Sequence, residues 1–96
     1  MSPKNKIKLN LLRKKIDKID LQLLQIIKKR TEIIKKVLLL KSNKNEVIDK
    51  KRISIILRRI KKESLRKNID PKITHRIWRN MIWSYINFEK KNFKRK

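Results

Sequence analysis

The first half of the chain carries apolar residues at alternating steps of three and four, the spacing of one face of an α-helix. This stripe consists of Leu12, Ile16, Ile19, Leu23, Ile26, Ile33, Val37 and Leu40. Arg30 stands where one apolar residue is missing. The pattern predicts a helix from about Ile7 to about Ser42, or about ten turns. Such a helix is too long to bury its stripe within one small subunit, so we expect a partner chain.

A second helix is predicted after a polar, turn-like segment from Ser42 to Glu46. Asp49 is a suitable N-cap for it, because its side chain can accept a hydrogen bond from a free amide of the first turn. The stripe of this helix consists of Ile53, Ile56, Leu57, Ile60 and Ser64.

A third helix is predicted to begin at Asp70 and Pro71, an N-cap followed by the residue that best suits the first helical position. Its stripe consists of Ile73, Ile77, Trp78, Met81, Ile82, Tyr85, Ile86, Glu89 and Phe93. The basic tail from Lys90 to Lys96 is expected to fray. The sequence therefore predicts an all-α chain that forms a single domain over residues 1–96.

The composition excludes several classes of functional site. The chain has no Cys, no Gly and one His, and its 31 Lys and Arg against 8 Asp and Glu give a formal net charge of +23. Without Cys there is no thiolate nucleophile or zinc finger, and without Gly there is no P-loop. The longest apolar run, Val37 to Leu40, is far too short to span a membrane, and residues 1–10 lack a signal-peptide core. We expect a cytoplasmic protein without a membrane partner.

The positive charge has two possible origins. An anionic partner such as nucleic acid would explain it, and so would a bias towards Lys, Ile and Asn that places lysines on solvated helix faces. Four arginines fit an outward surface and would allow weak nonspecific binding to polyanions: Arg58, Arg59, Arg66 and Arg76. A basic helical nucleic-acid-binding dimer is therefore an alternative of another functional class, although no specific nucleic acid is expected.

Charged residues on or beside the apolar stripes are more informative, because burying a charge is costly unless it is paired or binds a ligand. Arg30 interrupts the first stripe, and Arg13 and Lys41 lie near it. Arg30 and Lys41 are about 16 Å apart along nearly the same face, so both could reach one small anion. Arg13 and Arg30 are about 25 Å apart, so a site that contains both needs Arg13 from an antiparallel partner helix.

The other two stripes carry charges as well. We expect Arg52 to face inward at the start of the second helix, and Glu89 lies within the third stripe. Each such residue could instead be structural, as when Arg30 fixes the helix register by pairing with Asp17 or Asp20. Several inward polar groups in one small chain favour a shared cationic pocket in a dimer.

The order of these residues resembles the all-helical chorismate mutases. Residues 12–20, LRKKIDKID, resemble the opening LRxxIDxID of that family. The further matching positions are Leu23, Leu24, Arg30, Lys41, the DxxR-like pair Asp49 and Arg52, the segment Ile69-Asp70-Pro71, and the pair Tyr85 and Glu89. The resemblance covers about Leu11 to Lys90. Its specificity comes from the order and spacing of all these positions together, because no single position is specific.

The resemblance implies three-helix subunits with a long first helix, intertwined as a homodimer whose two sites are shared between the chains. It implies an isomerase that rearranges chorismate, a small dicarboxylate, to prephenate in aromatic amino-acid biosynthesis. The reaction has no covalent intermediate and implies no metal and no cofactor. The enzyme holds the compact conformer of chorismate and stabilises charge on the breaking ether bond.

The resemblance also implies roles for individual residues. Arg13 of the partner and Arg30 would each bind a carboxylate, and Lys41 would donate to a carboxylate and to the ether oxygen. Glu89 would contact the ether oxygen, and Arg30, Lys41 and Glu89 would be the catalytic residues. The substrate-binding residues would be Arg13, Arg30, Lys41, Asp49, Arg52, Ile53, Tyr85 and Glu89.

Two features depart from the pattern of many mutases. Many of them follow the arginine of the second helix with a Glu that contacts the substrate hydroxyl, whereas this chain has Ile53. Together with the aromatic-rich segment Met81–Ile86, this resembles the isochorismate-pyruvate lyase branch of the same fold, which produces salicylate and pyruvate. The mutase is favoured because aromatic amino-acid synthesis is the commoner need, and the lyase is the alternative.

Overall fold

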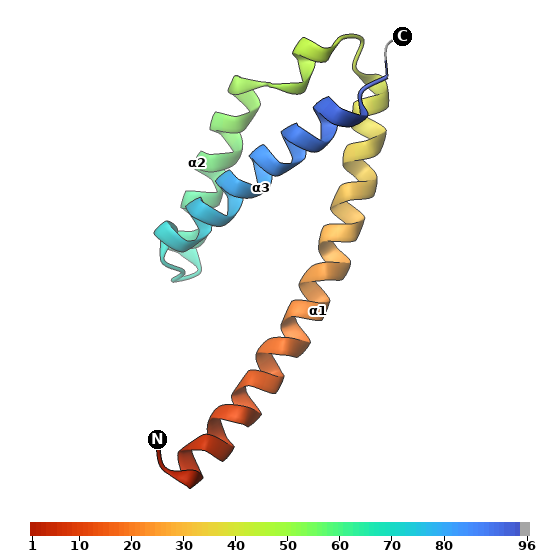
Figure 1. Ribbon diagram of the computed structural model, residues 1–96. Helices are drawn as coiled ribbons and strands as arrows, with labels where there is room; N and C mark the ends of the chain where they lie inside the picture. Colours follow the sequence, from red (N-terminus) through yellow and green to blue (C-terminus); the bar gives the residue numbers. More distant parts are fainter. Residues whose placement is uncertain (95–96) are drawn as a thin grey trace. The chain divides into compact units, whose positions relative to one another are not determined.

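The computed structural model describes residues 1–94, which form helices without any strand. The elements are α1 (Pro3–Leu40), the 3₁₀-helix η1 (Lys44–Val47), α2 (Lys50–Arg66) and α3 (Pro71–Asn92) (Figure 1). The all-α class and the three α-helices predicted from the sequence are confirmed. The chain divides into two compact units, Met1–Lys36 and Val37–Lys96. Within the described residues, no helix is both long enough and apolar enough to cross a membrane.

α1 is one uninterrupted helix of 38 residues. It begins four residues before the predicted start at Ile7, because Ser2 and Pro3 form a good helix start. The Ser2 hydroxyl accepts a hydrogen bond of 3.2 Å from the Asn5 amide, and Pro3 needs no amide partner in the first turn. All eight apolar members of the predicted stripe are exposed, namely Leu12, Ile16, Ile19, Leu23, Ile26, Ile33, Val37 and Leu40.

The connection between α1 and α2 contains η1, whereas the sequence predicts only a polar turn there. The Glu46 carboxylate organises this segment by accepting hydrogen bonds of 3.2 Å from the Ser42 and Asn43 amides. The Asn43 side-chain amide donates to the same oxygen at 3.1 Å. With its polar groups satisfied in this way, the segment can bury Val47, which is 3% exposed.

α2 and α3 lie side by side in the C-terminal unit (Figure 1). Four buried apolar residues form the core of this unit: Leu38, Val47, Ile82 and Ile86. Five partly buried residues pack against them: Ile48, Ile53, Ile56, Leu57 and Phe93. A buried hydrogen bond of 2.7 Å between the hydroxyl groups of Ser64 and Thr74 joins the two helices away from this core.

Both N-caps predicted from the sequence are confirmed. The Asp49 carboxylate accepts a hydrogen bond of 2.9 Å from the Arg52 amide, and the Asp70 carboxylate accepts one of 2.9 Å from the Lys72 amide. Between the helices, Asn68 has φ 57°, the left-handed conformation that Asn tolerates better than most residues. The Asp49 cap therefore fixes where α2 begins. Asn68 and the Asp70 cap fix where α2 ends and where α3 begins.

Replacing Asp70 by Ala should lower the free energy of unfolding by about 1 kcal/mol, because it removes the hydrogen bond to the Lys72 amide. Urea unfolding followed by circular dichroism measures this change. Asp70→Asn is the matched control, since its side-chain oxygen can still accept the bond. Equal unfolding midpoints for the Ala variant and the unsubstituted protein would contradict a stabilising cap.

The end of α3 corrects one prediction from the sequence. Fraying is expected from Lys90, but α3 continues to Asn92, whose side-chain amide donates to the Phe88 carbonyl at 2.8 Å. Phe93 packs against the core and so holds the last turn in place. The prediction is wrong for residues 90–92, and its part on residues 95–96 lies outside the described residues.

Candidate active site

Lys41 and Glu89 form a direct ion pair in the C-terminal unit. Lys41 follows the last residue of α1, and Glu89 lies on α3. The Lys41 Nζ donates a hydrogen bond to Glu89 Oε1 at 3.0 Å, across 48 residues of sequence. Their side chains are only 19% and 9% exposed. The structure therefore brings together two of the three residues expected to be catalytic.

The helical position of Glu89 explains why this carboxylate is buried. It lies three residues after Ile86 and four before Phe93, so all three share the face of α3 that meets the core. A lone carboxylate in such a place is strongly disfavoured, and the ammonium group of Lys41 compensates it. Any substitution that removes one partner leaves the other charge buried without its partner.

The ion pair leaves hydrogen-bonding capacity for a ligand. A lysine ammonium has three donors, and the bond to Glu89 uses one of them. The second carboxylate oxygen, Oε2, is not used by this bond and can accept a further hydrogen bond. The ammonium group can stabilise negative charge that develops on a ligand oxygen during a reaction.

Asp49 and Arg52 occupy the start of α2, and both are exposed. Asp49 acts as the N-cap, because one of its carboxylate oxygens accepts a hydrogen bond from the Arg52 backbone amide. The prediction that the Arg52 side chain faces the interior of the chain is wrong. The inward face of α2 begins one residue later, at Ile53, which leaves Arg52 beside that face.

Ile53 and Tyr85 are half-buried residues of the same unit. Ile53 packs against the core, so its side chain contributes apolar contacts and no hydrogen bond. Tyr85 lies one helical turn before Glu89, on the same side of α3. An aromatic ring and a carboxylate are therefore neighbours along the helix surface.

Arg13 and Arg30 belong to the N-terminal unit. Both are on α1, where Arg13 is exposed and Arg30 is partly buried. Arg30 is less exposed than the apolar members of its stripe, all of which are exposed. Their roles in a site therefore stay predictions.

The sequence pattern pointed to Lys41 and Glu89 separately but did not predict the direct contact between them. A contact across 48 residues leaves no local sequence signal. The available signal is that Glu89 stands within an apolar stripe and that Lys41 directly follows the apolar run Val37–Leu40. Within residues 1–94 there is no cluster of three or more His, Cys, Asp or Glu side chains that could bind a metal ion.

A family model, chorismate mutase type II, matches residues 12–90. The chain belongs to this family. All eight candidate residues, from Arg13 to Glu89, lie within the matched region, and so does the ion pair. No curated protein and no solved structure matches the chain.

Proposed function

We propose that this member of the chorismate mutase family is a chorismate mutase that converts chorismate to prephenate. The observation that carries the proposal is the part-buried pair of Lys41 and Glu89, which lies inside the region that the family model matches. A pericyclic rearrangement needs no nucleophile on the enzyme. It needs a substrate held in its compact conformer and hydrogen-bond donors where the ether bond breaks.

Lys41 and Glu89 would supply those donors. As the ether bond breaks, negative charge develops on its oxygen, and an ammonium hydrogen of Lys41 stabilises it. Glu89 donates to the same oxygen when its Oε2 carries a proton. The bond from Lys41 to Oε1 supports this arrangement, because it fixes the carboxyl group and does not use Oε2.

Arg13 and Arg30 would hold the two carboxylates of chorismate, with Arg13 supplied by the partner subunit. Arginine suits this role, since its planar guanidinium donates two parallel hydrogen bonds to one carboxylate. Asp49 and Arg52 would line the same pocket. The exposure of Arg52 supports a contact to a ligand, because its side chain is not committed to the core.

A homodimer should form through α1, because its apolar stripe is exposed along most of the helix. The exposed residues recur on one face and exceed what an isolated chain normally leaves open to water. Sedimentation velocity at micromolar concentration measures the mass directly, and we expect that of two chains. A monomer under these conditions would remove both the dimer and the shared site.

The decisive experiment for the function is product analysis with both candidate substrates. The purified protein is incubated separately with chorismate and with isochorismate, and the products are identified by chromatography and mass spectrometry. Prephenate from chorismate supports the mutase. No product from either substrate, with a folded protein, would overturn the proposal.

The lyase reaction is a second candidate, and Ile53 is the observation that favours it. Ile53 packs against the core and offers no donor to a substrate hydroxyl, which many mutases contact with a Glu at this position. Salicylate and pyruvate from isochorismate would identify this activity. Ile53→Glu should then shift the ratio of the two reactions towards prephenate.

A further inference from the structure

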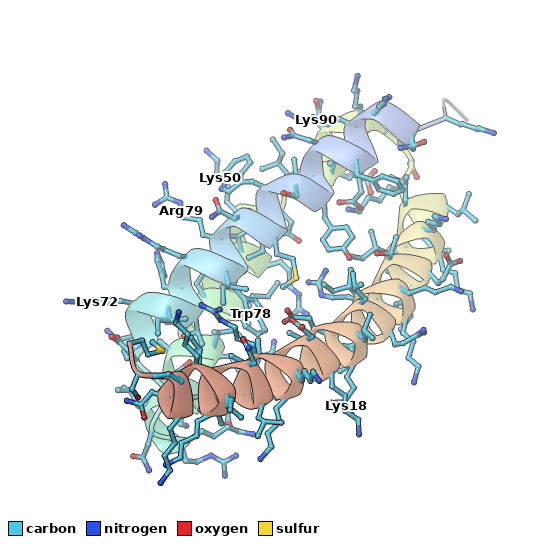
Figure 2. The ribbon with its side chains drawn as sticks, turned by 60° about the horizontal axis from the view of Figure 1, so that its bottom comes forward. Lys18, Lys50, Lys72, Trp78, Arg79 and Lys90 are labelled. Carbon is cyan, nitrogen blue, oxygen red and sulfur yellow. The ribbon has the colours of Figure 1, made fainter. Side chains whose placement is uncertain are left out.

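A basic groove lies between the second half of α2 and the first half of α3. It has a volume of about 850 Å³, and four cations line it: Arg58, Lys61, Lys72 and Arg76. Leu57 and Ile73 supply an apolar part of its wall. Lys72 projects from the start of α3 (Figure 2). This groove is distinct from the ion pair, because Lys72 and Glu89 are about 25 Å apart along α3.

The charge of this groove is not neutralised within the protein. Among residues 1–94, none of the four cations takes part in an ion pair. The carboxylates of the C-terminal unit are engaged elsewhere, in helix caps or ion pairs, namely Glu46, Asp49, Glu63, Asp70 and Glu89. Asp70 adjoins the groove in sequence, but it caps α3 through the Lys72 backbone amide.

Four unpaired cations in one groove favour a ligand with several linked negative charges. A single carboxylate or phosphate would compensate only part of the charge, whereas successive phosphates of a chain can meet successive cations. Arg58 and Lys61 are three residues apart on α2, and Lys72 and Arg76 are four apart on α3. Each pair therefore spans about one helical turn and forms one side of the groove.

A second copy of the chain is a poor occupant for the same groove. Met1–Lys36 holds 12 Lys and Arg but only three carboxylates, so α1 of another subunit would add positive charge. Like charges brought together repel each other, at a cost that low salt increases. The charge pattern thus favours an anionic ligand in the groove, and it disfavours α1 of a second subunit there.

We propose that the groove binds single-stranded nucleic acid, through the phosphates and without reading the sequence. A single strand exposes both its phosphates and its bases, so it can meet the cations and also the apolar Leu57 and Ile73. A duplex offers mainly phosphates at its surface, and its bases stay stacked inside. Among the described residues that line the groove, His75 carries the one aromatic ring on which a base could stack, and no Phe, Tyr or Trp lines it.

Binding is tested with the full chain and a fluorescent oligo-dT of about 16 nucleotides, by anisotropy at several salt concentrations. Four phosphate contacts correspond to a slope of log affinity against log salt of about −2.8, or about a 50-fold loss between about 50 and 200 mM. The variant that carries Arg58→Gln and Lys61→Gln should reduce the magnitude of this slope by about 1.4.

A matched control lies one residue further along the same helix. Arg59 and Lys62 are exposed on α2 and do not line the groove, so Arg59→Gln with Lys62→Gln removes the same charge from another face. We expect the control to retain the slope. Both double variants should keep the helical circular dichroism and the chorismate turnover of the unsubstituted protein.

Three results would overturn the proposal. Equal losses in the groove variant and the control would mean that overall charge, rather than this groove, binds the oligonucleotide. Duplex DNA binding as tightly as the single strand would contradict the preference for exposed bases. Unchanged oligonucleotide binding with an altered monomer–dimer equilibrium would assign the groove to a second copy.

Discussion

Arg30→Ala and Arg13→Ala should each nearly abolish chorismate turnover while leaving a folded helical dimer. Each substitution removes a charge-assisted contact to a substrate carboxylate, which we expect to cost roughly 2–4 kcal/mol in the transition state. Steady-state kinetics measure the loss, and circular dichroism and sedimentation check the fold. Arg59→Ala is the control, because this exposed arginine of α2 belongs to no proposed site.

Mixing the two inactive variants then tests whether the site is shared. In a heterodimer of the Arg13 and Arg30 variants, one of the two sites contains both intact arginines, so activity should return. Subunit exchange is verified by mass before the assay. Absence of recovery after verified exchange would mean that both arginines act within one chain or are structural.

The helix boundaries that the sequence predicts well are those with a strong local signal. Asp49 and the pair Asp70-Pro71 were expected to start helices, and they do. Such caps involve residues two or three positions apart, so the sequence holds all the information. The 3₁₀-helix η1 was missed because its main organiser, Glu46, is a polar residue in a stretch that is typical of a turn.

Which side chains face inward is harder to predict, since one residue corresponds to about 100° around a helix. Arg52 precedes Ile53, and that single step leaves its side chain exposed. Ile73 and Ile77 follow the period of α3, yet they are 57% and 52% exposed. A helix period predicts that one face is apolar, but the packing of the neighbouring helix decides which part of that face is covered.

The candidate site depends on contacts between residues distant in sequence. Periodicity placed Glu89 on an apolar face, but only the fold brings Lys41 to it across 48 residues. The resemblance to the chorismate mutases assigned both residues to the site because each was expected to contact the substrate. No sequence pattern or family resemblance predicted the basic groove. The sequence did predict correctly that Arg58 and Arg76 are exposed.

Glu89→Gln should keep turnover at neutral pH, whereas Glu89→Ala should lose roughly 2–4 kcal/mol of transition-state stabilisation. The Gln side-chain oxygen can still accept the hydrogen bond that Lys41 makes to Oε1, and its amide group is a permanent donor in place of Oε2. Ala removes both functions and leaves Lys41 without its partner. Steady-state kinetics of the three proteins at neutral pH measure this contrast.

Substrate binding by the same proteins tests the assignment of Glu89 to the ether oxygen. If Glu89 donates to this oxygen in the transition state, Glu89→Gln should keep both substrate affinity and turnover, because its amide is a donor of the same shape. Glu89→Ala should lose turnover more than affinity, since this contact strengthens only as charge develops on the oxygen. A Gln variant that binds substrate but is inactive would show that the carboxylate has another role, and the assignment of Glu89 to the ether oxygen would be wrong.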